Sequence, residues 1–547
     1  MSGLWKKIDS DKIYKISFVL VCFITLLVYG ISCYGASIAG DEYFSMGFAN
    51  NTQDFLFLSK GLVERYNADG WLPGQIMYKY LAVESGEKFS IIEIYRLVRE
   101  DVHPPLYFMI LNILSSFFTD KVTLVPGYVI NIVSGLIIVV IMMLLMRKIF
   151  RNKWISIITP LFWIVTRAAV IEMTYLRMYS VLCALMMVSI YIHILYMDDN
   201  KPEFRNCFLL FSVMGVGGLI HYYFYLIAFV LCLYTIVYFL RRKKYKMLIS
   251  YGALLLLSEI ISLILWPYVI KHLIFSERGT QVQENLGNMD ITHYLAFLRN
   301  MLSTVGTFCY NSKTVYIWST IAIIVIISIF ILILSNRNLS VSIKNIFVKE
   351  KGIRDLSVIM IAEMGYFIIL SKISYSYRWL YISPVFALVV ISTVAIAYIA
   401  LSLINKNISI PTLFIATIII LWANIPNNIK WSLMEYNKNM ERHNHIIGYA
   451  DSCDIIYVYE DWNCLYDNQI LEMMNFDEIY SVNYIDIDKK DFYEIISKRK
   501  DNSKNLLIYL QPSLEHPELI CEGICNDIHA TYELIDKQPI YYLRINN

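Results

Sequence analysis

The apolar run ISFVLVCFITLLVYGISCYGASI, residues 16–38, decides the fold of this chain. A membrane-spanning helix needs about 20 apolar residues, so this run is long enough to cross a bilayer. The segment IAGDEYFS (38–45) completes it and adds two adjacent carboxylates, Asp41 and Glu42. Acids in that position lie where a helix leaves hydrocarbon and meets water. We therefore interpret the segment as the mouth of an active site that faces away from the cytoplasm.

The composition extends this interpretation to the whole chain. Of its 547 residues, 57% are hydrophobic and only 17% are charged, and the mean hydropathy is +0.52. Soluble globular domains are far less apolar, so we predict an α-helical polytopic membrane protein. The net charge of +2 carries no functional information by itself, and no basic and aromatic patch predicts nucleic-acid binding.

Apolar runs along the chain predict about eleven transmembrane helices. If these helices alternate in direction, the basic loops 147–153, 241–246 and 337–354 all face the cytoplasm. Lysines precede the first run and no cleavage site follows it, which predicts an uncleaved helix with a cytoplasmic N-terminus. The predicted spans are 16–38, 122–146, 154–171, 176–197, 207–220, 222–240, 247–270, 314–334, 356–370, 380–404 and 408–425.

The apolar run 104–118 determines the topology of the remaining spans. As a helix it covers roughly 22 Å, short of the ~30 Å hydrocarbon core. We therefore predict a juxtamembrane helix that does not cross. The odd number of spans then places the C-terminal region outside the cytoplasm, whereas a crossing would invert the basic loops.

The composition changes sharply after residue 428. Strand-like segments alternate there with helix-like ones, which predicts a small α/β domain. We expect a transmembrane catalytic domain, 1–427, with an external loop, 39–103, and an extracytoplasmic domain, 428–547. Without a glycine-rich phosphate loop, no nucleotide site is predicted in the second domain. The strand-like segments are 455–460, 478–482, 505–510 and 540–545.

Polar clusters fall at the outer ends of the predicted helices. Carboxylates beside cations at one depth suit a reaction that takes a proton from a hydroxyl and expels an anionic phosphate. The clusters beyond the Asp41–Glu42 pair contain Asp101 with His103, Glu172 with Arg177 and Tyr179, His221 among tyrosines, and Lys372 with Arg378.

Four of these segments together resemble a known family. They are GDEYFS (40–45), DVHPPLYF (101–108), LRMYS (176–180) and YRWLYISP (377–384). This ordered set is similar to the GT-C membrane glycosyltransferases, in the branch that holds the protein O-mannosyltransferases and the aminoarabinose-transferase-like enzymes (glycosyltransferase family 39-like). The resemblance covers about residues 16–425. The HPPLGK form of the eukaryotic mannosyltransferases is here HPPLYF, so a protein acceptor does not carry over.

The resemblance implies an inverting hexosyl or pentosyl transfer from a polyprenyl-phosphate donor to a hydroxyl outside the cytoplasm. Asp41 would be the catalytic base or orient the acceptor, and Glu42 would support it. The donor phosphate would be bound by Arg378 and, less directly, by Arg177 and Lys372, because a guanidinium can pair with it bidentately. The residues that support the site would be Asp101, His103, Tyr179 and His221.

Structural roles remain open for the same residues. Arg378 and Lys372 could be interfacial anchors whose charged ends reach water. Arg177 could pair with Glu172, and His221 could be a satisfied interfacial histidine. His103 could simply end one helix before Pro104 starts the next.

The resemblance implies a polyprenyl-phosphate sugar and the bilayer as ligands, and the acceptor stays open among an envelope glycan, a lipid and a protein. No cofactor is required, and a divalent cation stays open because some relatives in the superfamily use one. Cys521, Cys525 and His529 follow one another at intervals of four residues, so a helix could put all three on one face. Without a fourth ligand, this pattern favours isolated thiols or a disulfide over a metal site. The rival functions are a lipid-linked saccharide flippase and a non-catalytic envelope assembly protein. A flippase predicts charges deep within spans and repeat symmetry.

Overall fold

In the computed structural model, the chain forms two compact units. The first comprises Met1–Ala36, Val98–Tyr107 and Gly127–Ser432, and the second Ser37–Leu97, Phe108–Pro126 and Leu433–Asn547. The predicted span 314–334 lies outside the described residues. The structure describes residues 10–34, 40–51, 70–99, 101–287, 291–310, 346–374, 378–405, 407–418, 440–459, 469–510, 514, 516–536 and 540–545.

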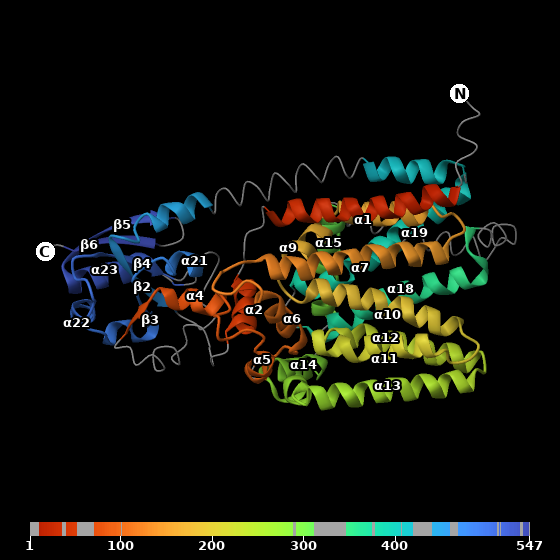
Figure 1. Cartoon of the computed structure of the whole chain (residues 1–547), viewed down its shortest axis with the longest axis horizontal. Coiled ribbons are helices and arrows are strands. Elements are labelled where there is room, and N and C mark those ends of the chain that lie inside the picture. Colours follow the sequence, from red (N-terminus) through yellow and green to blue (C-terminus); the bar gives the residue numbers. More distant parts are fainter. Residues whose placement is uncertain are drawn as a thin grey trace, which may run out of the picture. The chain divides into compact units, whose positions relative to one another are not determined.

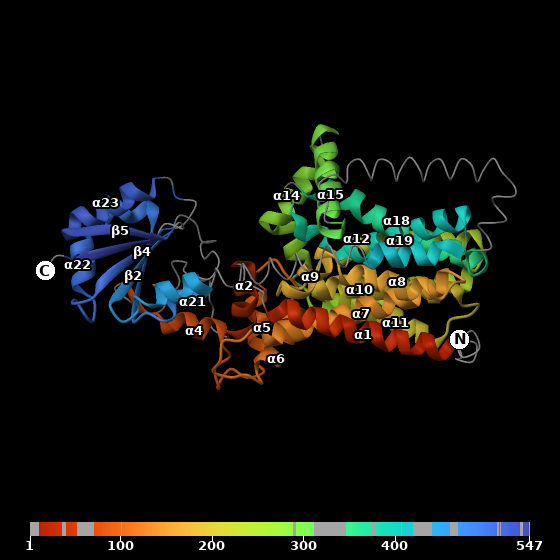
Figure 2. The same ribbon diagram turned by 90° about the horizontal axis from the view of Figure 1, so that it is seen from above.

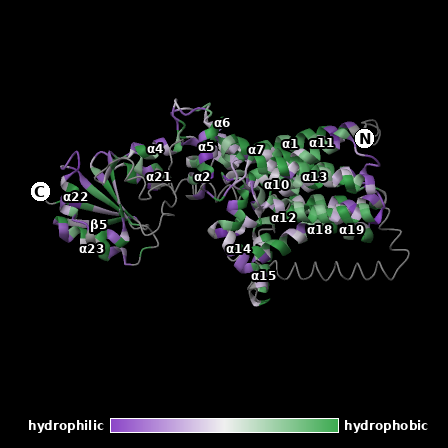
Figure 3. Ribbon diagram, turned by 90° about the horizontal axis from the view of Figure 1, so that it is seen from below, coloured by the Kyte–Doolittle hydropathy of each residue, from purple (hydrophilic) through white to green (hydrophobic). Residues whose placement is uncertain are grey.

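The first unit is a bundle of apolar helices (Figures 1 and 3). Within the described residues, seven helices are long and apolar enough to cross a membrane, or eight if one bent pair counts as a single span. In a bilayer every backbone polar group must be satisfied internally, and a helix does this along its whole length. The chain is therefore a multi-pass membrane protein. The seven are α1 (Ser10–Tyr34), α7 (Val125–Ile149), α10 (Tyr179–Asp198), α12 (Phe224–Arg241), α13 (Tyr245–Leu265), α18 (Lys349–Ile373) and α19 (Phe386–Ile404), and the shorter α11 (Phe204–Ile220) packs against α10 and α13.

The predicted span 154–171 is broken into two helices. They are α8 (Ile155–Ile164) and α9 (Arg167–Thr174), which meet at 64°. Thr166 stabilises both sides of the break: its hydroxyl donates to the Trp163 carbonyl at 2.8 Å and accepts from the Ala169 N–H at 3.1 Å. Because one side chain satisfies the end of α8 and the start of α9, the chain turns here without losing its hydrogen bonds.

Three predicted apolar segments form short helices. The run 104–118 forms α6 (Leu106–Ser115), which has 10 residues and covers about 15 Å. It is too short to cross by itself, as predicted. The predicted span 207–220 corresponds to α11, with 17 residues, and the described part of the predicted span 408–425 lies in helix Asn407–Ile418.

The second unit contains a six-stranded sheet in the order β1-β3-β2-β4-β6-β5. The central strand β2 is parallel to β3 and β4, and β6 is antiparallel to β4. Figure 2 shows the small helices of this unit beside its strands. The strands are β1 (Trp71–Pro73), β2 (Cys453–Tyr459), β3 (Glu478–Asn483), β4 (Asn505–Leu510), β5 (Ala530–Asp536) and β6 (Ile540–Ile545), and the helices include α2 (Gly40–Asn50), α4 (Gln75–Leu81), α5 (Ile91–Val98), α21 (Gln469–Met473), α22 (Phe492–Ser497) and α23 (Pro517–Ile528).

Both faces of the sheet are buried at its central strand β2. Along β2, Ile455 and Tyr457 pack into one hydrophobic cluster, whereas Ile456 and Val458 pack into the other. Successive side chains of a strand point to opposite faces, so a continuous apolar strand suits a sheet covered on both sides.

The edge strand β1 comes from the region before the second predicted span. Trp71 pairs with Tyr480 of β3, and its indole N–H donates to the Ile495 carbonyl at 2.7 Å. Residues distant in sequence from the C-terminal region therefore complete its sheet.

Candidate active site

A chain of three polar side chains forms the centre of the candidate site. The Nδ1 of His103 lies 2.7 Å from Oδ2 of Asp101, and its Nε2 lies 3.4 Å from Nη2 of Arg177. Asp101 and His103 belong to the segment before α6, and Arg177 lies between α9 and α10. The structure thus joins two of the segments that the sequence singled out, although 74 residues separate His103 from Arg177.

The partners of His103 determine its tautomer. Arginine can only donate, so Nε2 accepts from Arg177 and Nδ1–H donates to the Asp101 carboxylate. Burial lowers the pKa of His103, and the charge of Arg177 acts in the same direction against the opposing effect of Asp101. Burial alone would raise the pKa of Asp101, but its interactions with His103 and the nearby Arg177 charge bring it down to about 2. The site therefore holds a neutral imidazole between a carboxylate and a guanidinium.

His221 and Tyr179 adjoin this chain of side chains. The ring of His221 lies 5.9 Å from that of His103 and 5.4 Å from that of Tyr179, between centroids. Nδ1 of His221 accepts the backbone N–H of Tyr223 at 3.0 Å, so a neutral His221 carries its proton on Nε2. Burial and the positive charges of neighbouring side chains, including Arg177, hold the pKa of His221 well below its usual value.

Arg278, on α14 (Glu277–Gly287), is a cation that the sequence analysis did not select. Its side chain is exposed, and its positive charge lowers the pKa of both His103 and His221. The segment ERGTQVQENLG (277–287) lies between the predicted spans 247–270 and 314–334. The sequence feature that could have identified Arg278 is a cation in a polar segment next to the end of a predicted membrane span.

A hydrogen-bond relay fixes the segment that carries Asp101. Trp266 Nε1 donates to the Tyr222 hydroxyl at 3.0 Å, which donates to Nδ1 of His272 at 2.8 Å. Nε2 of His272 donates to the Arg99 carbonyl at 3.0 Å. Each donor and acceptor is used consistently, so the relay holds the backbone next to Asp101 in one place.

Aromatic side chains extend from His221 toward the predicted YRWLYISP segment. Tyr223 contacts His221 at 4.6 Å and Tyr381 at 5.5 Å, between ring centroids. The Tyr381 carbonyl accepts from the Tyr366 hydroxyl at 2.6 Å. Trp379, in the same short turn, contacts Tyr175 at 5.5 Å. This part of the segment is therefore attached to the candidate site through ring contacts.

The two predicted phosphate-binding residues of the last cluster lie at exposed positions. Nζ of Lys372 lies 5.3 Å from the centroid of Tyr294, on α15 (Ile291–Tyr310). Arg378 immediately precedes the turn Trp379–Tyr381 and is exposed. Their assignment as donor phosphate-binding residues stays a prediction.

Asp41 and Glu42 lie in the first turn of α2, in the second unit. Asp41 is half-buried, and its carbonyl accepts from Ser45 Oγ at 3.3 Å. Only 2% of Glu42 is exposed. Carboxylates are favourable at a helix N-terminus because of its partial positive charge. Their assignment as catalytic residues stays a prediction.

Glu172 is buried within α9, with 3% of its surface exposed. Within the described part of the chain, neither of its carboxylate oxygens has a hydrogen-bond partner. The neighbouring Ser383 hydroxyl donates instead to the Leu380 carbonyl, at 3.1 Å. The alternative in which Arg177 pairs with Glu172 is therefore wrong.

No three His, Cys, Asp or Glu side chains are arranged to hold a metal ion among the residues that the structure describes. In the second unit, Cys521 and Cys525 are buried free thiols of α23. His529 ends that helix.

Comparison with known proteins gives a result only at the level of structure. No family model matches the sequence, and no curated protein matches it. The crystal structure of ArnT from Cupriavidus metallidurans bound to undecaprenyl phosphate is similar, with a TM-score of 0.52, 10% identity, and coverage of 96% of this chain and 97% of that one. Its apo state gives a TM-score of 0.50 at the same identity and coverage. The chain thus has the fold of ArnT over nearly its whole length, which confirms the predicted fold class of a helical polytopic membrane protein.

Proposed function

We propose that this protein is an inverting glycosyltransferase that moves a sugar from a polyprenyl-phosphate donor to a hydroxyl of a cell-envelope acceptor. The observation that carries the proposal is the group Asp101–His103–Arg177, whose imidazole also feels the positive charge of Arg278. Two guanidinium groups beside neutral donors suit a lipid-linked phosphate, because they neutralise the charge that develops on it as the sugar leaves. A fold like that of ArnT bound to undecaprenyl phosphate agrees with this choice of donor.

In the proposed reaction, the acceptor oxygen forms a bond to the anomeric carbon of the sugar. The bond between that carbon and the phosphate oxygen breaks, and the electron pair leaves with the polyprenyl phosphate. The hydroxyl proton passes to a carboxylate, which we assign to Asp41 with Glu42 in support. Arg177 and Arg278 bind the leaving phosphate, and the Nε2–H of neutral His221 donates to one of its oxygens.

Asp101 and His103 act as positioning residues in this proposal. Asp101 fixes the orientation of His103, and His103 accepts a hydrogen bond from Arg177. This hydrogen bond fixes the orientation of the Arg177 guanidinium, and with it the direction of its other N–H groups. The reaction is assigned to the outer face of the membrane, where the polar helix ends of the predicted topology lie.

The test is sugar transfer in membranes from a panel of radiolabelled polyprenyl-phosphate sugars. Arg177→Ala and Arg278→Ala should each lower kcat/KM by about 10²-fold, as the loss of a charge-stabilising donor does. Arg96→Ala is the matched control, because Arg96 is exposed and pairs with Glu93 on the surface of α5. Asp41→Asn should abolish transfer.

The outcomes separate the proposed roles. Full transfer by Asp41→Asn would refute the base assignment, and full transfer by both arginine variants would refute the phosphate site. Movement of an intact lipid-linked saccharide across the membrane, without transfer to any hydroxyl, would favour the flippase.

A further inference from the structure

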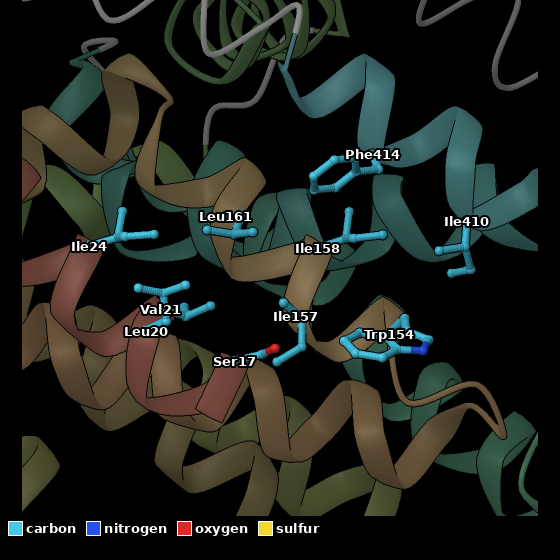
Figure 4. A pocket seen from close by; sticks show the side chains of 10 residues that line it. All are labelled: Ser17, Leu20, Val21, Ile24, Trp154, Ile157, Ile158, Leu161, Ile410 and Phe414. Atoms are coloured by element: carbon cyan, nitrogen blue, oxygen red, sulfur yellow. The ribbon is translucent and has the colours of Figure 1, made fainter. Parts of the chain in front are cut away.

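An apolar cavity of ≈ 250 Å³ lies between three helices of the first unit (Figure 4). Leu20 and Ile24 of α1, Ile158 and Leu161 of α8, and Phe414 of helix Asn407–Ile418 line it. Leu20 is 52% exposed and Phe414 is 48% exposed. The cavity is therefore a groove that opens to the outside of the bundle.

The groove lies at hydrocarbon depth. Its α1 residues belong to the span Lys12–Tyr34, and the stretch from Ser17 to Ile24 covers about 10 Å along the helix. Water does not fill an apolar cavity of this kind. Hydrocarbon chains of the bilayer are the molecules that surround it.

One end of the groove is polar and basic. Ser17 and Trp154 line that end, next to a 3.0 Å hydrogen bond between Tyr14 and Ser156. Nζ of Lys153 lies 5.9 Å from the centroid of the Tyr14 ring. An amphipathic aromatic and a lysine at the end of an apolar groove are the groups that meet lipid headgroups at an interface.

We propose that this groove binds an acyl chain of an anionic phospholipid whose phosphate lies at Lys153. An acyl chain gains no hydrophobic energy when it leaves the bilayer for the groove, because both are equally apolar. The headgroup therefore determines which lipid binds, and the basic end of the groove favours a negatively charged headgroup. Basic pockets between transmembrane helices bind such headgroups by the same attraction.

The donor of the proposed reaction is a different ligand. Cys33, near the other end of α1, contacts the Met173 carbonyl in α9, only a few residues from Arg177. Along α1, Ser17 and Cys33 are about 24 Å apart. A phosphate at Lys153 is thus remote from the phosphate site at Arg177, and the lipid site does not depend on the proposed transfer reaction.

The test compares lipid retention by the purified full chain in native mass spectrometry. Phosphatidylglycerol and phosphatidylcholine with identical acyl chains are offered in equal amounts. Wild type should retain phosphatidylglycerol about fivefold better, the effect of one lysine near a headgroup. Lys153→Gln should remove this preference, whereas Lys201→Gln, at an exposed position after α10, should keep it.

A second pair of variants tests the groove itself. Leu20→Trp fills the groove, so an acyl chain there can no longer hold its headgroup at Lys153, and the preference for phosphatidylglycerol should be lost. Leu27→Trp, 48% exposed on the same helix and not part of the lining, should keep that preference. Equal retention of both lipids by wild type, or an unchanged preference in Leu20→Trp, would overturn the proposal. So would displacement of phosphatidylglycerol by equimolar polyprenyl phosphate, which would assign the groove to the donor instead.

Discussion

His103 and His221 are neutral imidazoles in a positively charged environment. His103 accepts from Arg177 through Nε2, and His221 accepts a backbone N–H through Nδ1. Burial lowers the pKa of each, and the charge of Arg278 acts in the same direction. A neutral donor next to arginines can bind a phosphate without adding charge of its own, and it keeps that role across the physiological pH range.

These lowered pKa values predict how stability depends on pH. Unfolded histidines have a pKa of about 6.5. Below that pH, the unfolded chain binds protons that the folded His103 and His221 do not, so the free energy of unfolding falls. The thermal midpoint of the detergent-solubilised protein should therefore decrease from pH 7.5 to 5.5. His221→Gln should reduce that decrease, whereas His445→Gln, at an exposed position, should leave it unchanged. An unaltered slope in His221→Gln would contradict a neutral His221.

At the scale of elements, two local devices shape the two units. Thr166 breaks an apolar run into α8 and α9, and this break precedes the segment that carries Arg177. In the second unit, β1 reaches the sheet through Gly70, whose φ of +109° is in the region that favours glycine. Gly74 then follows the strand and approaches the carbonyls of Met473 and Phe476.

Gly74→Ala should disrupt the attachment of β1. A Cβ at Gly74 would lie 2.2 Å from the Phe476 carbonyl oxygen and 2.5 Å from that of Met473. Backbone atoms must move to relieve such a contact, at a cost of about 1–3 kcal/mol. Hydrogen exchange at β1 and β3 should accelerate. Gly86→Ala is the matched control, because a Cβ there meets nothing within 4 Å. Equal protection in both variants would show that β1 is not tightly attached.

At the scale of the molecule, a charge cluster joins three helices of the first unit. Asp198, at the end of α10, pairs with Lys148 of α7 and with two cations of α18, Lys351 at 3.0 Å and Arg354 at 2.9 Å. Arg354 also pairs with the buried Asp355. Next to the cluster, the rings of Phe150, which follows α7, and Phe347, which precedes α18, stack with their centroids 5.2 Å apart. One carboxylate thus connects helices that are far apart in sequence.

Asp198→Asn should lower the thermal stability of the whole bundle. Its side chain is 18% exposed, so the loss lies between that of a surface pair and that of a buried one, at about 2 kcal/mol. The three cations Lys148, Lys351 and Arg354 would then repel one another without the negative charge of Asp198 between them. Differential scanning fluorimetry in detergent measures the shift, with Glu203→Gln, an exposed acid before α11, as the control. A midpoint equal to that of the control would show that the cluster is fully screened by water.

The sequence by itself determined the membrane bundle and the α/β character of the C-terminal region, and it singled out Asp101, His103, Arg177 and Tyr179 as polar residues at helix ends. These features depend on local patterns: the length of an apolar run, the continuity of a buried strand, and polar residues at helix ends. Each can be evaluated within about 20 residues of sequence, because bilayer thickness and strand length impose the pattern directly.

Only the tertiary structure decided which groups meet and in which chemical form. The tautomers of His103 and His221 depend on partners from other elements. Arg278, whose charge lowers the pKa of His103, lies on α14, outside every predicted span, and β1 pairs with a strand some 400 residues away. Such contacts are chosen by packing and charge in three dimensions, so no local pattern encodes them.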